Sequence, residues 1–134
     1  MQHKSTSLTI GVIMPAIHES CQSMIWPGIS DFAREMGVKL VTYVATSQDQ
    51  ISSLDLHYEI IGDFVKNSSL DGVIIFTGAI GQHCSHDAIA ALVKKIDAIP
   101  TVAIALKLPN TSTVLVENGV GIVEMMTHFI KDHH

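Results

Sequence analysis

Two segments of the chain carry most of the side chains that could do chemistry. The first contains His18, Glu19 and Gln22, which come just after the apolar run 8–15. The second, "FTGAIGQHCSH" over residues 76–86, combines two glycines with two histidines around a cysteine. Such residues could bind a phosphate, a metal ion or another small molecule, and their spacing discriminates between these possibilities.

The glycines do not favour phosphate binding. A dinucleotide-binding turn needs Gly-x-Gly-x-x-Gly after the first strand, so that the backbone can approach the pyrophosphate. The corresponding turn reads "MPAIHES" (14–20) and has no glycine, while Gly78 and Gly81 lie in a later turn without the lysine of a Walker motif. The glycines are better explained as permitting a tight exit from a buried strand. No cofactor is expected.

A metal site at His83, Cys84 and His86 is also disfavoured. Adjacent side chains rarely point at one ion, and no second Cys/His pair stands at ligand spacing. Ser85 is better explained as the N-cap of a helix that has Asp87 in its first turn.

Catalytic and phosphorelay motifs are missing as well. There is no Gly-x-Ser-x-Gly, and nothing identifies an oxyanion donor or an orienting group for Cys21 and its neighbour His18. A wall or core position suits Cys21 better. A receiver domain would need acidic residues where this chain has Met14-Pro15 and Thr77-Gly78. The chain is therefore not expected to be an enzyme.

Composition and charge indicate one globular domain. Of the 134 residues 47% are hydrophobic and 16% are charged, which suits a packed core rather than disorder. The net charge is −5, and the basic residues are scattered with only Lys94-Lys95 adjacent, so a nucleic-acid surface is not expected. Two unrelated cysteines, a polar N-terminus and no apolar run of transmembrane length predict a cytoplasmic, reduced location without membrane contact.

Apolar runs alternate with helical patterns along the chain. The runs are 8–15, 38–45, 72–78, 100–106 and 112–117, and most are apolar at consecutive positions, as in parallel strands covered on both faces. Between them, apolar residues recur at helical spacing in three stripes: Ile25, Ile29, Phe32, Ala33 and Met36; Ile51, Leu54, Tyr58, Ile61 and Val65; Ile89, Leu92, Val93 and Ile96. This alternation predicts a βαβ series with a parallel sheet.

Local signals mark the ends of these helices. Ser47 and Gln50 form a capping box before the second stripe, and Gly37 stands where a helix C-cap tolerates positive φ. Pro27 falls within the first helix, which is either kinked there or regular only from that point; a kinked helix is favoured.

A ligand site is expected where the strands end. In an open parallel sheet, ligands bind beyond the carboxyl ends of the strands. An ordinary solvated loop would show the same polar residues, so position alone leaves both interpretations open. The candidate ligand-binding residues at this edge are His18, Glu19, Gln22, Thr77, Gln82 and Glu117.

The order of the segments resembles a known family. The stretches "LTIGVIMP", "GISDFAREMGVKLV", "SSLDGVIIFTG", "IPTVAIAL" and "TSTVLVENGVGIVEMMTHFIKDHH" together resemble the effector-binding core of the LacI family, which has the type I periplasmic-binding-protein fold. "VENGVG…THFI" is similar to the signature Val-Asp-Asn-x-x-Gly…His-Leu-Ile, with Glu117 in place of the aspartate. "FTGAIG" and "CQSMIWPGI" look closer to a branch that precedes a diguanylate cyclase or a sensor kinase.

This resemblance, which covers residues 8–134, implies a flavodoxin-like three-layer α/β/α sandwich with strand order 2-1-3-4-5. Residues 8–118 would form the N-terminal lobe after a disordered or extended segment 1–7, and 119–134 would resemble the first helix of a second lobe. The helix-turn-helix of the family's repressors and the rest of the second lobe are missing from the sequence. We therefore expect a truncated chain or a module reduced to one lobe, with no DNA binding of its own.

The resemblance also implies a function. The expected role is sensing of a small effector, such as a sugar or nucleoside, and signalling to an output domain outside this chain in transcriptional, two-component or cyclic-di-GMP regulation. The helix 119–132 has an apolar stripe without a partner (Ile122, Met126, Phe129 and Ile130), which predicts a homodimer through this helix or the last strand. The alternatives are a dimerisation and signal-relay module without ligand, or an enzyme of flavodoxin-like fold.

Overall fold

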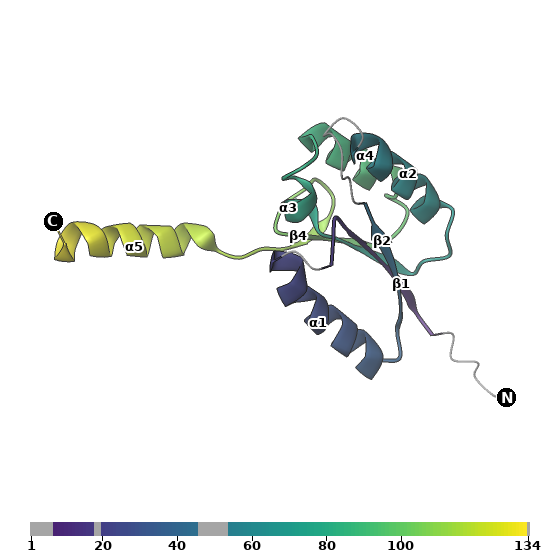
Figure 1. Cartoon of the computed structure of the whole chain (residues 1–134), viewed down its shortest axis with the longest axis horizontal. Coiled ribbons are helices and arrows are strands. Elements are labelled where there is room, and N and C mark those ends of the chain that lie inside the picture. Colours follow the sequence, from purple (N-terminus) through teal and green to yellow (C-terminus); the bar gives the residue numbers. More distant parts are fainter. Residues whose placement is uncertain (1–6, 18–19, 46–53, 134) are drawn as a thin grey trace.

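The computed structural model describes residues 7–17, 20–45 and 54–133. Strands and helices alternate through most of this part of the chain (Figure 1). The elements in order are β1 (Thr9–Met14), α1 (Ser20–Glu35), β2 (Lys39–Val44), α2 (Leu54–Lys66), β3 (Gly72–Ile75), α3 (Thr77–Ile80), α4 (His86–Lys95), β4 (Thr101–Ile104), β5 (Ser112–Val114) and α5 (Asn118–Asp132).

The five strands form one parallel sheet. Their order is β2-β1-β3-β4-β5, with β1 pairing to β2 on one side and to β3 on the other. The order changes direction between β1 and β3, which places their carboxyl ends at the switch point of the sheet. Both the parallel sheet and the strand order confirm the prediction from the sequence.

The central strands bury side chains on both faces. Ile13 and Ile75 belong to one hydrophobic cluster, while Val12, Met14 and Phe76 belong to a second cluster on the opposite side. All five are almost fully buried. Consecutive apolar residues are needed because alternate side chains of a strand point to opposite faces, and here both faces are covered.

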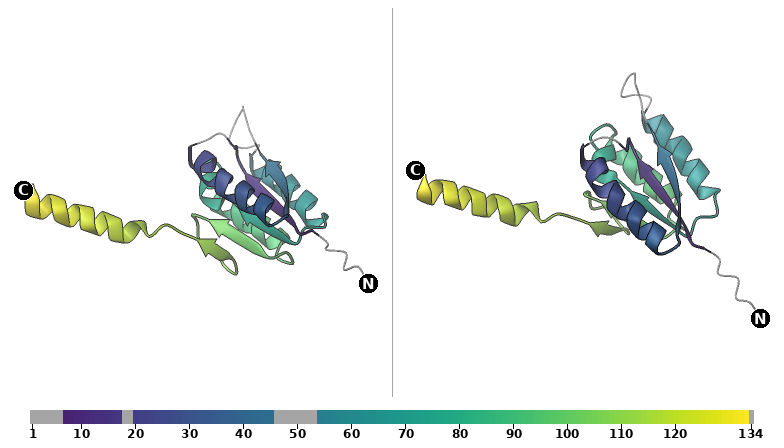
Figure 2. Two further views of the ribbon diagram at one scale, coloured as in Figure 1. Left: turned by 90° about the horizontal axis from the view of Figure 1, so that it is seen from below. Right: turned by 60° about the horizontal axis from the view of Figure 1, so that its bottom comes forward.

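Helices lie on both sides of the sheet and complete the predicted three layers. In Figure 1, α2 and α4 lie together above the sheet and α1 lies alone below it. The view from below in Figure 2 shows α1 across the β1 side, while β4 and β5 have no helix over them. One side of the sheet therefore carries less cover than the other.

Most predictions for the helices are confirmed. Tyr58 and Val65 of α2 and Ile89 and Leu92 of α4 lie in the core, as their stripes predicted. In contrast, Ile25 and Phe32 of α1, and Met36 just after its end, are exposed. The face of α1 that packs toward the sheet comprises Trp26, Ile29 and Ala33 instead. The α1 stripe predicted from the sequence is thus partly wrong: apolar residues occupy more of this helix than the sheet can cover.

The helix ends follow their local signals. Gly37 has a φ of 66°, and the Ser85 hydroxyl accepts a hydrogen bond from the Ala88 N–H at 3.1 Å. Pro27 lies inside α1, as the favoured interpretation required. The predicted capping box at Ser47 and Gln50 lies outside the described residues.

One predicted loop is a short helix. The segment expected to leave the sheet as a glycine-rich loop forms the single turn α3. Gly81 has an ordinary helical φ of −65°, so the backbone does not require a glycine there for a positive φ. At Gly78, a Cβ would lie only 2.7 Å from the Cβ of Ala105, so the glycine permits a close approach between α3 and the chain after β4.

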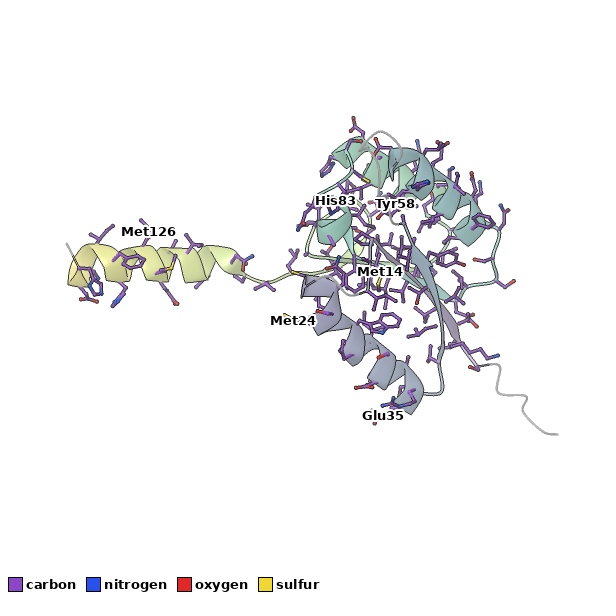
Figure 3. The ribbon with its side chains drawn as sticks, in the orientation of Figure 1. Met14, Met24, Glu35, Tyr58, His83 and Met126 are labelled. Carbon is purple, nitrogen blue, oxygen red and sulfur yellow. The ribbon has the colours of Figure 1, made fainter. Side chains whose placement is uncertain are left out.

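The last helix extends away from the rest of the molecule. Figure 1 shows α5 separated from the sheet by an extended linker, and Figure 3 shows Met126 on it, far from Met14 in the core. The α5 side chains are all exposed, including the predicted stripe. Among the described residues, no helix is both long and apolar enough to span a bilayer.

Candidate functional site

A small cavity lies at the carboxyl ends of β3 and β4. Its volume is about 210 Å³, and it opens between the start of α1, the turn α3 and the residues that follow β4. This is the edge at which an open parallel sheet binds its ligands. The residues around the cavity, called here the candidate pocket, are Cys21, Gln22, Ile25, Phe76, Gly78, Ala79, Gln82, Ile104 and Ala105.

The structure brings two of the predicted residues together here. Gln22 comes from α1 and is almost fully buried, whereas Gln82 follows α3 and is exposed. A glutamine amide both donates and accepts hydrogen bonds, so a pair of them suits a ligand rich in hydroxyl or amide groups. The remaining walls are largely apolar, as in most small-molecule sites.

Thr77 supports the candidate pocket from behind. It is fully buried, and its hydroxyl lies 2.7 Å from the carbonyl oxygen of Ile104 and 3.2 Å from that of Leu106. The hydroxyl donates to these carbonyls and ties the start of α3 to the residues that leave β4. Thr77 therefore does not line the cavity but fixes the position of two of its walls.

Another wall of the candidate pocket includes a strained residue. Ala105 has a φ of 70°, a left-handed conformation that is uncommon for a residue with a Cβ. Its N–H donates to the Val114 carbonyl at 2.9 Å, and its Cβ faces Gly78 closely. Backbone strain of this kind persists only where surrounding contacts enforce it, and it occurs often at ligand sites.

The other predicted residues do not join this cavity. Glu117 is exposed in the linker before α5, and its side chain makes no cap hydrogen bond to the helix. His18 and Glu19 lie outside the described residues.

No group of three or more His, Cys, Asp or Glu residues within the described part of the chain is arranged to hold a metal ion. Cys84 has a different environment from the one that a metal ligand needs. Partial burial, together with the adjacent Asp55 carboxylate, raises the pKa of the Cys84 thiol to about 11. The thiol is therefore protonated at neutral pH, whereas the thiolate is the form that binds metals and acts as a nucleophile.

A larger hollow lies elsewhere, between the end of α4 and the loop before β5. It has a volume of about 630 Å³ and includes Val93, Pro100, Leu108 and Thr111 in its walls. It opens at the amino ends of the strands, away from the edge where this fold class binds ligands. We therefore retain the smaller cavity as the candidate site.

Sequence reasoning missed part of the candidate pocket. The sequence predicts Cys21 in a wall or the core, and it does line the cavity, but Ile25, Ile104 and Ala105 carry no chemical signal of their own. Helical spacing could have identified Ile25, which follows Gln22 by three residues on α1. Nothing local marks Ala105, because its role depends on contact with a segment 27 residues earlier.

No family model matches the chain, and neither does any curated protein. Several solved structures do match. The lac repressor dimer bound to operator and the anti-inducer ONPF has a TM-score of 0.70 at 14% identity, covering 98% of this chain and 43% of that one. A LacI-family transcriptional regulator from Mycobacterium smegmatis has a TM-score of 0.69 at 17% identity, covering 93% and 41%.

A third match includes a bound ligand. The Cra transcriptional dual regulator from Pseudomonas putida, in complex with fructose 1-phosphate, has a TM-score of 0.63 at 16% identity, covering 93% of this chain and 43% of that one. All three structures are of transcriptional regulators. The chain shares the α/β fold of these structures, and it spans less than half the length of each of these proteins.

Proposed function

We propose that this chain is a small-molecule-sensing lobe of a regulatory protein. The observation that carries the proposal is that Gln22 of α1 and Gln82, which follows α3, line the same cavity at the carboxyl edge of a sheet with the fold of LacI-type regulators. Paired amides recognise hydroxyl groups, which favours a sugar, a sugar phosphate or a nucleoside as the effector class. The fructose 1-phosphate held by the similar Pseudomonas regulator supports the same class.

The small volume of the cavity supports a binding site that is shared with a second lobe or a second copy of the chain. At about 210 Å³ it is smaller than the roughly 300–1,000 Å³ of typical ligand pockets. A second wall, from another lobe or another copy of the chain, would complete it. The effector would then favour one of two arrangements of these parts, which is what signalling to an output domain requires.

The proposal includes a homodimer and a cytoplasmic location without a catalytic role for this chain. Exposed apolar residues on α5 support self-association, and the two thiols Cys21 and Cys84 are unpaired. The output domain, whether a DNA-binding domain, a cyclase or a kinase, would lie outside this chain. A relay module without ligand is the second candidate, favoured by the exposure of α5 alone.

Titration calorimetry and thermal shift with sugars, sugar phosphates and nucleosides test this function. We expect weak binding, with a Kd on the order of 0.1–10 mM, because a half-site loses contacts and excludes water poorly. Gln82→Ala should weaken binding about tenfold without changing stability, since the residue is exposed. The matched control Asn67→Ala removes an amide far from the cavity and should leave binding unchanged.

Two results would contradict the proposal. Nanomolar binding by this chain alone would show that the site needs no second wall. A complete lack of response in every ligand class would favour the relay module.

A further inference from the structure

The larger hollow of the molecule lies between the end of α4 and the segment before β5. It is called here the α4 hollow, and its walls come from residues 90–101 and 108–111. Its volume of about 630 Å³ lies within the roughly 300–1,000 Å³ that is typical of small-molecule sites. It shares no lining residue with the candidate pocket. The α4 hollow therefore has the dimensions of a separate ligand site.

One wall of the α4 hollow is fixed by a tight turn. Leu108 is 3% exposed and belongs to the core cluster of α2 and α4. Pro109 is followed by Asn110, whose left-handed φ of 56° suits the third position of a type II turn. The Thr111 hydroxyl donates to the Leu108 carbonyl at 3.0 Å. The chain thus holds this wall in place by itself, and a preformed site costs less free energy to occupy.

The floor of the α4 hollow is apolar. Val93 of α4 and Ile99 before β4 are half-buried and pack against the same core cluster as Leu108. The Thr101 hydroxyl, which also borders the hollow, donates to the Ile99 carbonyl at 2.8 Å. Hydrocarbon therefore forms most of the surface here, which suits the apolar part of a ligand.

Two opposite charges border the α4 hollow without pairing. Lys94 and Asp97 both line it, and neither side chain has an ion pair or a hydrogen bond with any other described residue. The adjacent Lys95 behaves differently, because its Nζ lies 2.9 Å from Asp63 Oδ1 and 3.8 Å from Glu59 Oε1. The hollow thus offers one cation and one anion beside an apolar floor.

We propose that the α4 hollow is a second ligand site, which binds an α-amino acid with an apolar side chain. Lys94 pairs with the carboxylate of the ligand, and Asp97 pairs with its ammonium group. The side chain of the ligand covers Val93, Ile99 and Leu108. This site goes beyond the proposed function and does not depend on it, because the candidate pocket lies at the carboxyl edge of the sheet.

The charges favour a zwitterion over a simple acid or amine. An organic acid would bring a second negative charge toward Asp97, and an amine would bring a second positive charge toward Lys94. The net charge of −5 also disfavours an anionic ligand, whereas a zwitterion carries no net charge. Each ion pair is weak at an exposed position, so the apolar contact must contribute as well.

Amide NMR of the isotope-labelled chain, titrated with L-leucine, is the first test. We expect the shifts to concentrate at residues 93–101 and 108–111, with a Kd on the order of 1 mM because so small a ligand makes few contacts. The amides of Gln22 and Gln82 should not move. No shifts at leucine concentrations of about 50 mM, or shifts centred on Gln22 and Gln82, would overturn the inference.

Analogues of leucine test the chemistry of recognition. Isocaproate lacks the ammonium group, leucinamide lacks the carboxylate, and glycine lacks the apolar side chain. Each should bind about tenfold more weakly than leucine, or less well still. Isocaproate or leucinamide binding as tightly as leucine would show that only one charge is read, and would overturn the zwitterion site.

Single variants assign the two charges. Lys94→Gln and Asp97→Asn should each weaken leucine binding about tenfold and leave thermal unfolding unchanged, because both side chains are exposed. The matched controls are Lys66→Gln in the last turn of α2 and Asp87→Asn in the first turn of α4. Both controls should change the Kd less than about twofold.

Filling the α4 hollow provides an independent test. Ala98 is exposed and lines the hollow, so Ala98→Phe should abolish leucine binding without disturbing the core. Unchanged binding in a folded Ala98→Phe variant, or in both charge variants, would overturn the inference. Calorimetry with sugars and nucleosides would still decide the proposed function, because those ligands are expected at the other edge of the sheet.

Discussion

The two sides of the sheet differ in how completely they are covered. On one side, α2 and α4 bury a large cluster that includes Ile13, Ile75 and Leu92. On the other, the buried cluster beside α1 contains only Val12, Met14 and Phe76, and Ile74 and Ile104 pack against it while remaining partly exposed. The candidate pocket lies on the less covered side. The larger buried cluster therefore lies on one face of this sheet, and the candidate pocket lies on the other.

Adjacent isoleucines on β3 give the sharpest test of this difference. Ile75 is fully buried on the α2–α4 side, and Ile74 faces the α1 side, where it is partly exposed. Ile75→Ala should lower the free energy of unfolding by about 2–5 kcal/mol, because it leaves a cavity in the core. Ile74→Ala should cost about half as much or less, measured by urea unfolding at low protein concentration.

Measuring the unfolding of both variants at several protein concentrations tests the same difference. If the proposed homodimer covers Ile74, the cost of Ile74→Ala should grow as the dimer forms, whereas the cost of Ile75→Ala should stay constant. Equal costs for both variants at every concentration would contradict the difference between the two faces.

Two helical glycines test the close approach at the candidate pocket. Gly78→Ala puts a Cβ 2.7 Å from that of Ala105, so we expect a loss of about 1–3 kcal/mol in unfolding free energy. Gly28→Ala in α1 meets no heavy atom within 4 Å and should gain up to about 1 kcal/mol from helix propensity. Thermal unfolding of both variants measures this contrast, and a neutral Gly78→Ala would contradict the tight packing of α3.

The alkylation rates of the two cysteines distinguish the two faces of the sheet. Cys21 is exposed on the α1 side, while Cys84 packs against the cluster of the α2–α4 side. Because the pKa of Cys84 is about 11, its reaction with iodoacetamide at pH 8 should be slow and should increase as the pH rises toward 11. Mass spectrometry of the labelled chain at several pH values measures both rates.

Replacing Asp55 tests the cause of this slow reaction. The carboxylate disfavours the thiolate, so Asp55→Asn should lower the pKa of Cys84 and accelerate its labelling by up to about tenfold. Asp87→Asn, in the first turn of α4, is the matched control and should have little effect. An unchanged rate in Asp55→Asn would leave burial as the only cause.

The sequence was sufficient for most of the fold. Consecutive apolar residues in β1 and β3 predicted buried parallel strands, and Gly37 and Ser85 marked helix ends correctly. The exposed Phe32 and the turn α3 were not predicted. Which face of α1 meets the sheet depends on packing, and α3 depends on Gly78 meeting Ala105, a contact between distant segments.

The sequence predicted the sheet edge at which the candidate site lies, but it did not predict which residues form the cavity. The rule for parallel sheets predicted Gln22 and Gln82 at the carboxyl ends of the strands, and both line the cavity there; their binding of a ligand stays a prediction. The same rule could not show that Thr77 uses its hydroxyl on the backbone, or that Glu117 lies in a linker beyond the sheet. Both outcomes depend on tertiary contacts that no local pattern records.

The strand order has a consequence for how the chain folds. β1 is made first, yet it lies between β2 and β3, and its pairing with β3 joins Ile10 to Gly72. The central strand therefore has an unpaired edge until residues 72–75 have left the ribosome. Such long-range pairing is slow to form, and exposed edges and apolar helices associate meanwhile. Folding yield should thus depend on synthesis rate and chaperones more strongly than the stability of the finished sheet suggests.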